Sequence, residues 1–153
     1  KYFDGKVVKP SKLYFEEEVD FETVIEGGIF KTQKNFDNFE FQTGLNELWT
    51  IVRRANKYID ETAPWVLAKD ENAKEALNSV MYHLYEALRL TAILVSPVMP
   101  DASNIILEEL GANDSNKTFD SLKYGLTEEA VVTKTPIVLF KRLDVQKELA
   151  KHE

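Results

Sequence analysis

Cysteine is absent from the 153 residues, and histidine occurs only twice. Without cysteine the chain forms neither a disulfide nor a thiolate metal site, and a reducing, cytoplasmic setting is the natural expectation. The histidines, His83 and His152, have no other metal donors at workable spacing, so no zinc cluster is expected. Nucleophile-elbow serines, dinucleotide fingerprints and phosphate-binding glycine loops are also missing. The sequence therefore predicts no catalysis by this chain itself.

Long hydrophobic runs are missing as well. The longest apolar stretch, near 90–95, ends at Ser96-Pro97, far short of the roughly 20 residues that a membrane-spanning helix needs. No signal-like leader is present, so a membrane role is not expected. Because the chain begins with Lys1 rather than Met, we expect it to be a piece of a longer protein.

Basic charge is in short supply, with 19 Lys and Arg against 26 Asp and Glu and a net charge of -7. This balance argues against a surface that binds nucleic acid everywhere, because phosphate neutralisation supplies most non-specific affinity. Acidic residues crowd into 16–26, whereas Arg53, Arg54 and Lys57 form a small basic cluster. Two interpretations remain open: solvated helix faces of opposite sign, or a basic edge that meets a few phosphates.

A length of 153 residues suits one packed domain. Apolar periodicity and stop signals predict four helices, over 15–33, 41–60, 70–95 and 100–111. Gly27-Gly28 is expected to weaken or bend the first of them. The residues over 5–11 are predicted as a connector. The chain after the fourth helix is predicted as an extended segment over 113–142, with short apolar runs around Pro136, and the start of a polar helical linker over 143–153.

The helix over 41–60 has the clearest pattern. Apolar residues, Trp49 among them, recur at steps of three and four, which predicts one buried stripe with Arg53, Arg54 and Lys57 largely outside it. Trp49 keeps this register and is therefore expected in the core.

Two other candidate sites have structural interpretations. Carboxylates at Glu16, Glu17 and Glu18 suit a paired-carboxylate site in principle, but adjacent helix positions point in different directions, so a solvated face is favoured. His83 lies between apolar neighbours on the third predicted helix, and a buried structural role is favoured over a general base.

The run Asn56–Lys69, which reads NKYIDETAPWVLAK, places an aromatic residue behind a proline where the second predicted helix ends. Trp65 falls outside the apolar register of that helix. Without further information, an aromatic residue at such a position packs inward more often than it binds a ligand. A helical protein-interaction or purely structural module, with Trp65 as a staple at a helix start, therefore stays open.

This run resembles the N-[KR]-Y-[IV]-D-x-x-x-P-W segment of the anticodon-binding domain of methionyl-tRNA synthetases, most closely the bacterial ones. The blocks KYFDG at 1–5 and LVSPVMP at 94–100 are similar to two further segments of that domain. The resemblance covers 1–111 in matching order, and 137–144 is similar to the family's return segment. Class I synthetases for isoleucine, valine, leucine and cysteine share part of the pattern and remain alternatives.

The resemblance implies an all-α helical bundle over 1–112, followed by the extended tail. It also implies a partner, the anticodon loop of a methionine tRNA, and the enzyme that joins methionine to this tRNA. In this family Trp65 would stack on an anticodon base, Pro64 would fix the approach of the ring, and Asn56, Arg53 and Lys57 would be candidates for base-edge or phosphate contacts. Stacking suits splayed loop bases because each offers an apolar face.

The catalytic domain of such an enzyme is expected upstream of this chain and would be its second partner. That domain would use ATP and Mg²⁺, with Zn²⁺ as a further candidate, and no cofactor is expected in this chain; neither DNA nor a membrane is an expected partner. The family also reads the anticodon with an asparagine and an arginine on a helix that precedes the block at 1–5. Without that helix we expect weak tRNA affinity and self-association through uncovered apolar surface.

Overall fold

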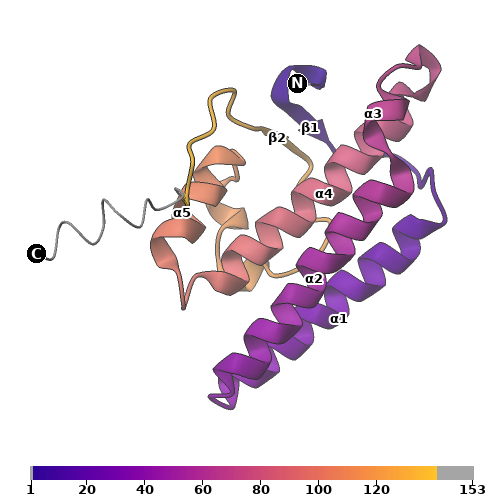
Figure 1. The fold of residues 1–153 in the computed structure, drawn as a ribbon. Helices are drawn as coiled ribbons and strands as arrows, with labels where there is room; N and C mark the ends of the chain where they lie inside the picture. The colour runs from indigo at the N-terminus through magenta and orange to yellow at the C-terminus, as the bar shows by residue number, and fades with distance from the viewer. Residues whose placement is uncertain (1, 141–153) are drawn as a thin grey trace, which may run out of the picture.

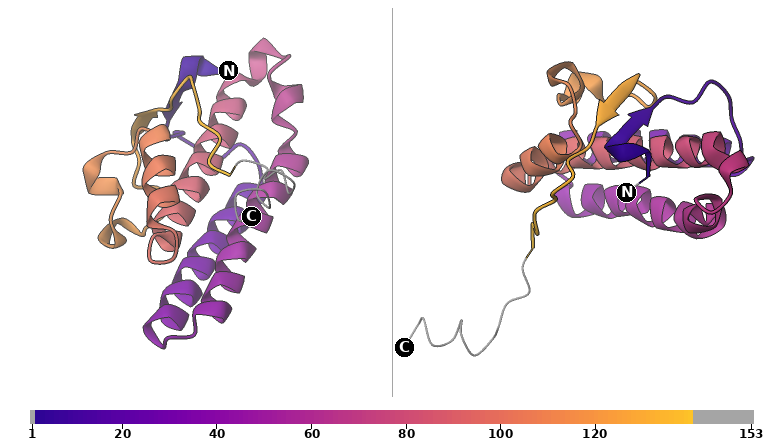
Figure 2. Two further views of the ribbon diagram at one scale, coloured as in Figure 1. Left: turned by 60° about the vertical axis from the view of Figure 1, so that its left-hand side comes forward. Right: turned by 90° about the horizontal axis from the view of Figure 1, so that it is seen from above.

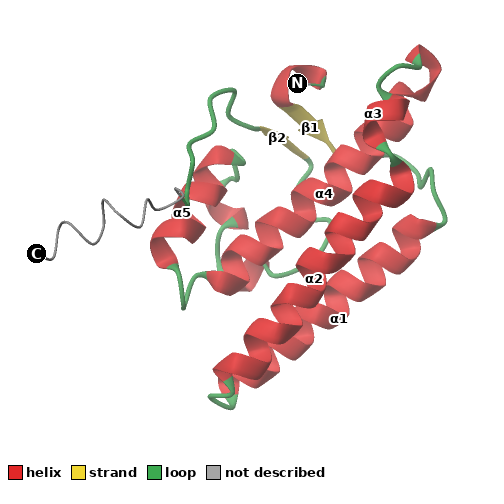
Figure 3. Ribbon diagram, viewed as in Figure 1, coloured by secondary structure: helices red, strands yellow, loops and turns green. Residues whose placement is uncertain are grey.

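A computed structural model describes residues 2–140, and most of that length is helical (Figure 3). The α-helices are α1 (Glu17–Asp37), α2 (Phe41–Thr62), α3 (Pro64–Leu67), α4 (Lys74–Val95) and α5 (Pro100–Glu109). Short 3₁₀ turns lie at Phe3–Gly5, Glu71–Ala73, Asp114–Asn116 and Phe119–Ser121, and the strands are β1 (Lys6–Val8) and β2 (Glu129–Val131). The predicted all-α fold class is confirmed, and within residues 2–140 no helix has the length and hydropathy to cross a bilayer.

Helix α4 is the centre of the fold. Figure 1 shows α1 and α2 as an antiparallel pair on one side of α4, with α5 and the strands on the other, and the two views of Figure 2 agree. The main cluster of buried side chains lies where α1, α2 and α4 meet, with Phe21, Ile51 and Leu90 each fully buried. The predicted linker over 143–153 lies outside the described residues.

Strands β1 and β2 form an antiparallel ribbon that the sequence did not reveal. The residues over 5–11 were expected as a connector, but Lys6–Val8 pairs with Glu129–Val131, and Val7 lies opposite Ala130. Each strand has three residues, which is too short for an alternating pattern to stand out. Val7 and Ala130 are buried against Tyr82 and Tyr85 of α4, so the ribbon joins the beginning of the chain to its later part.

Helix α1 is one continuous helix across Gly27-Gly28, where the sequence led us to expect a weakened or bent helix. A Cβ atom at Gly28 would lie 2.5 Å from Cγ1 of Ile51, whereas one at Gly27 would meet nothing within 4 Å. Gly28 therefore lets α1 and α2 approach closely, which offsets its low helix propensity.

Two apolar residues that were expected inside are exposed. On α2, Leu48, Ile51 and Tyr58 are buried, but Trp49 is 50% exposed, so its assignment to the core is wrong. Leu88 of α4 is one of the apolar positions that predict the helix over 70–95, so it too was expected inside, but it is 52% exposed. Both residues lie at the edge of a broad apolar stripe, and periodicity alone does not tell which edge a neighbouring helix covers.

Glu18 and Arg54 were expected to face solvent, but both are buried. Glu18 is fully buried, so the favoured solvated face does not hold for it; its carboxylate accepts hydrogen bonds from Ser79 Oγ at 2.6 Å and the Tyr14 amide at 2.7 Å. Arg54 is 8% exposed and donates to Asp20 of α1 at 2.9 Å. Buried charge requires such partners, and these partners come from segments distant in the sequence.

His83 is buried, as expected, at 3% exposure. Its Nδ1 forms a hydrogen bond with the Tyr124 hydroxyl, and its Nε2 lies 3.6 Å from a Glu18 carboxylate oxygen. Burial is the largest influence on the pKa of His83 and lowers it, while the nearby carboxylates oppose that shift. The imidazole is thus a structural group between α4, α1 and the segment after α5.

Candidate functional site

The candidate site lies where α2 ends and α3 begins. Ala63 adopts a left-handed conformation, with φ 42° and ψ 62°, and is both the C-cap residue of α2 and the N-cap residue of α3. Its amide donates to Ile59 O at 3.0 Å, and its carbonyl accepts from the Val66 amide at 2.8 Å. A left-handed alanine costs on the order of 1–2 kcal/mol, so the surrounding contacts must hold this turn in place.

Pro64 and Trp65 follow this turn directly. Pro64 occupies the first position of α3, where its fixed φ suits a helix start and its missing N–H would have no helical partner. Pro64 is buried, whereas Trp65 is 49% exposed. The proline therefore anchors the short helix in the bundle while solvent reaches the indole of the next residue.

The other three predicted site residues lie on α2. Arg53, Asn56 and Lys57 are all exposed, and Asn56 and Lys57 precede Trp65 by nine and eight residues. At 1.5 Å per residue, Lys57 is about 8 Å along the axis from the end of α2. The structure thus places these three residues on the solvent side of the helix that leads into Trp65.

The three cations of the basic cluster, Arg53, Arg54 and Lys57, have different environments. Arg54 is turned inward, and its guanidinium lies 5.3 Å from the centre of the Phe21 ring. Glu61 accepts from Arg54 Nη1 at 2.9 Å and pairs with Lys57 Nζ at 3.3 Å. Arg53 donates to Thr50 Oγ1 at 3.1 Å and forms no ion pair within the part of the chain that the structure describes. Arg53 is consequently the cation of this cluster with most freedom to meet a phosphate.

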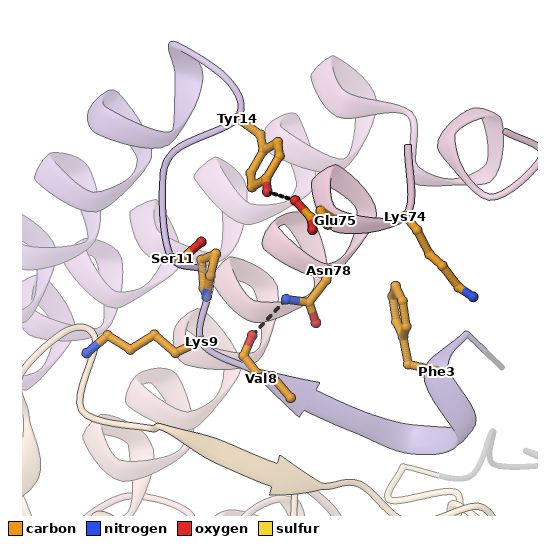
Figure 4. Close-up of a pocket in the computed structure, with 9 residues that line it drawn as sticks. Phe3, Val8, Lys9, Ser11, Tyr14, Lys74, Glu75 and Asn78 are labelled. Carbon is orange, nitrogen blue, oxygen red and sulfur yellow. Dashed lines mark hydrogen bonds between the residues drawn. The ribbon is translucent and has the colours of Figure 1, made fainter. Parts of the chain in front are cut away.

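A separate hollow lies beside β1 and the start of α4 (Figure 4). The Tyr14 hydroxyl donates to the Glu75 carboxylate, and Asn78 Nδ2 donates to the Val8 carbonyl at 2.9 Å. The hydrogen bond to Glu75 is the main reason that the pKa of Tyr14 is raised. These polar groups satisfy one another across the hollow, and Trp65 is not part of its lining.

No group of three or more metal-ligating side chains occurs among residues 2–140. The exposed Trp49 is the residue that sequence reasoning missed at this surface. The sequence shows that Trp49 lies one turn before Arg53, but the apolar register of Trp49 predicts burial. Trp49, Arg53 and Asn56 recur at steps of four and three, so they share one face of α2.

Comparison with known proteins identifies the family. The profile of the anticodon binding domain of methionyl tRNA ligase matches residues 10–152. A methionine--tRNA ligase of Caldanaerobacter subterraneus subsp. tengcongensis is 45% identical over 155 residues, which covers 100% of this chain and 24% of the relative. The corresponding Bacillus subtilis ligase is 40% identical over 152 residues, covering 98% of this chain and 23% of that protein.

Solved structures agree with the sequence comparison. The free form of Mycobacterium tuberculosis methionyl-tRNA synthetase superposes with a TM-score of 0.83 at 27% identity, over 94% of this chain and 29% of that one. A structure of the same synthetase bound by methionyl-adenylate gives a TM-score of 0.80 at 26% identity, over 88% of this chain and 27% of that one. This chain spans about a quarter of the length of the relatives it matches. The resemblance drawn from Asn56–Lys69 is thereby confirmed, and the chain belongs to the anticodon-binding domain family of methionyl-tRNA ligases.

Proposed function

We propose that this chain receives the anticodon loop of a methionine tRNA, in an enzyme whose catalytic part joins methionine to that tRNA with ATP. The observation that carries the proposal is the exposed indole of Trp65, held on a buried proline at the α2–α3 turn. A splayed loop base offers a flat apolar face, and stacking on an exposed indole shields both from water.

The neighbouring polar groups suit the same ligand. Arg53 and Lys57 supply positive charge on the face of α2 that leads to Trp65, and Asn56 offers both a donor and an acceptor for a base edge. Lys57 shares its charge with Glu61 at 3.3 Å, so Arg53 is the stronger candidate for a phosphate contact. Few cations on an otherwise acidic chain, with a net charge of -7, favour local recognition of a loop over binding along a duplex.

The chemistry belongs to the part of the enzyme outside this chain. We assign the use of ATP and Mg²⁺, and Zn²⁺ where it is present, to the catalytic domain, which is the second proposed partner of this chain. A relative of known structure binds methionyl-adenylate, in keeping with that division. The residues described here would position the tRNA and take no part in the transfer of methionine.

The test is Trp65→Ala in the full-length ligase. Loss of one base stack, worth roughly 1–3 kcal/mol, should lower kcat/KM for tRNA charging by about 5- to 150-fold. Methionine-dependent pyrophosphate exchange, which needs no tRNA, should keep its rate. Trp65→Phe should restore most of the charging because it retains an aromatic face.

An equal loss of charging and exchange in Trp65→Ala would indicate misfolding and would contradict a recognition role. Unchanged tRNA charging by a folded Trp65→Ala variant would favour the alternative, in which Trp65 has a purely structural role at the start of α3. The 49% exposure of Trp65 supports the recognition role better than the structural one.

A further inference from the structure

Trp49 presents half of a large aromatic side chain to solvent, with 50% exposure in the middle of a regular helix. Tryptophan is highly buried on average, and its large apolar area makes exposure costly. Trp49 lies at the outer edge of the apolar stripe of α2, because Leu45 and Val52, each one turn away, are half-buried, whereas Arg53, also one turn away, is exposed. An exposed indole at this edge, one turn from the cation of Arg53, offers an apolar face on which a flat ligand can stack.

The face of α2 that carries Trp49 runs on to the end of the helix, after which Trp65 follows on α3. Trp49, Arg53, Asn56 and Asp60 follow one another at steps of four, three and four, and all four are exposed. From Trp49 to the end of α2 the helix extends about 20 Å at 1.5 Å per residue. This length is within reach of a few extended nucleotides, so one RNA strand can extend from the α2–α3 turn to Trp49.

The positive charge of Arg53 on this face suits the phosphate of an RNA strand. The Arg53 guanidinium donates to Thr50 Oγ1 at 3.1 Å, which draws it back toward the helical turn that holds Trp49. Arg53 has no carboxylate partner within residues 2–140, so it can neutralise a phosphate beside a base stacked on Trp49. The acidic member of the face, Asp60, lies near the Trp65 end and limits phosphate binding there. Aromatic platforms interleaved with cations are typical of surfaces that bind single-stranded nucleic acid.

We propose that Trp49 is a second stacking platform for the RNA that Trp65 engages, with Arg53 holding the phosphate of the stacked nucleotide. The ligand is a nucleotide of the anticodon arm outside the one that Trp65 contacts. This inference rests on the proposed function, since it requires the RNA to reach α2 through the Trp65 end of the site. Trp49 is therefore a binding residue, and it takes no part in the transfer of methionine.

The experiment compares Trp49→Ala and Trp49→Phe with Phe30→Ala in the full-length ligase. Phe30 is 67% exposed on α1 and serves as the matched control for loss of an exposed aromatic ring. In Trp49→Ala, KM for tRNA should rise by about 5- to 150-fold, and the inhibition constant of an isolated anticodon stem-loop competing with tRNA should rise equally. Pyrophosphate exchange should keep its rate, Trp49→Phe should restore most of the KM, and Phe30→Ala should change neither quantity.

Failure of this inference is distinguishable from failure of the proposed function. If Trp65→Ala weakens the stem-loop while Trp49→Ala does not, the second platform is disproved and the anticodon site stands. If both variants leave the stem-loop unchanged, both proposals fail. A KM that rises equally in Phe30→Ala, or one that Trp49→Phe does not restore, also overturns the inference. Light scattering that shows Trp49→Ala converting a dimer to a monomer would assign the indole to a second copy of the chain.

Discussion

His83 is the residue whose ionisation most directly tests the core. Its imidazole lies among the rings of Phe21, Tyr58 and Tyr124, with Nε2 3.6 Å from the Glu18 carboxylate and Nδ1 bonded to the Tyr124 hydroxyl. Burial lowers the pKa of His83 from an ordinary value of 6.5, despite the opposing charges of Glu18 and Glu86. The folded chain therefore holds this residue neutral in conditions where the unfolded chain protonates it.

A pH dependence follows with a definite sign. Below pH 6.5, the unfolded chain binds a proton at His83 that the folded chain does not, so the free energy of unfolding falls as pH falls, until the folded-state pKa is reached. The slope is at most about 1.4 kcal/mol per pH unit for one proton. Urea unfolding between pH 7 and 5 should show a shallower loss of stability in His83→Gln, which cannot titrate.

The difference between the two proteins is the informative quantity, because other carboxylates titrate in both. A wild-type chain that gains stability relative to His83→Gln as pH falls would mean that the imidazolium pairs with Glu18. That outcome would contradict the lowered pKa.

For individual residues, the sequence indicated candidates for the site, but it did not indicate for every residue whether its side chain is buried or exposed. Trp65 and Pro64 could be singled out because the pattern around them breaks the apolar register. Burial of Glu18 and Arg54 could not, because their partners Ser79 and Asp20 are supplied by other segments of the fold. A charged residue is placed inside only when the tertiary structure has already provided its hydrogen bonds.

Among the elements, the α1–α2 pair depends on one glycine and not on its neighbour. Gly28 lies against Ile51 with no room for a methyl group, while the space beside Gly27 is open. The two positions share a helix and a residue type, so they form a matched pair. Contact between the helices, and not backbone flexibility, distinguishes them.

Gly28→Ala should lower the free energy of unfolding by about 1–3 kcal/mol, because the added Cβ would force Ile51 or the α1–α2 spacing to shift. Gly27→Ala should raise it by about 0.5–1 kcal/mol, because alanine has the higher helix propensity. Thermal or urea unfolding followed by circular dichroism measures both. Equal effects of the two substitutions would show that α1 and α2 can separate at Gly28 without cost.

The long elements were predictable and the short ones were not. The bounds of α2 and α4 agree with the predicted 41–60 and 70–95 to within a few residues, since many apolar repeats fix a long amphipathic helix. Asp70 is a residue type that caps helix starts, so the sequence predicts it as the cap of the helix over 70–95. Its side chain accepts from the Asn72 amide at 2.9 Å and thus caps the 3₁₀ turn before α4 rather than α4 itself. The β1–β2 ribbon depends on pairing between residues more than a hundred positions apart, which no local pattern contains.

On the scale of the whole molecule, a buried ion pair ties the segment after α5 to the bundle. Glu86 and Arg89 of α4 are fully buried and bonded to each other at 2.9 and 3.0 Å. Arg89 also donates to the carbonyls of Ser121 at 3.0 Å and Lys123 at 2.9 Å, while Glu86 accepts from the Gly125 amide at 2.8 Å. These bonds satisfy backbone groups of an irregular segment that has little regular secondary structure of its own.

Arg89→Met should therefore destabilise the chain by about 3–5 kcal/mol, because it leaves Glu86 as an unpaired buried charge and frees the carbonyls of the segment over 116–123. Lys117→Met is the matched control: Lys117 pairs with the fully exposed Asp114 at 3.2 Å, and its loss should change stability by no more than about 0.5 kcal/mol. Hydrogen exchange should show amides of that segment losing protection before those of the α1–α2 pair. If urea titration instead gives Arg89→Met a free energy of unfolding within about 1 kcal/mol of the wild type, packing alone holds the segment and the ion pair is dispensable. If Arg89→Met loses amide protection early only in the segment over 116–123, the bundle that carries Trp65 keeps its shape independently of the chain that follows α5.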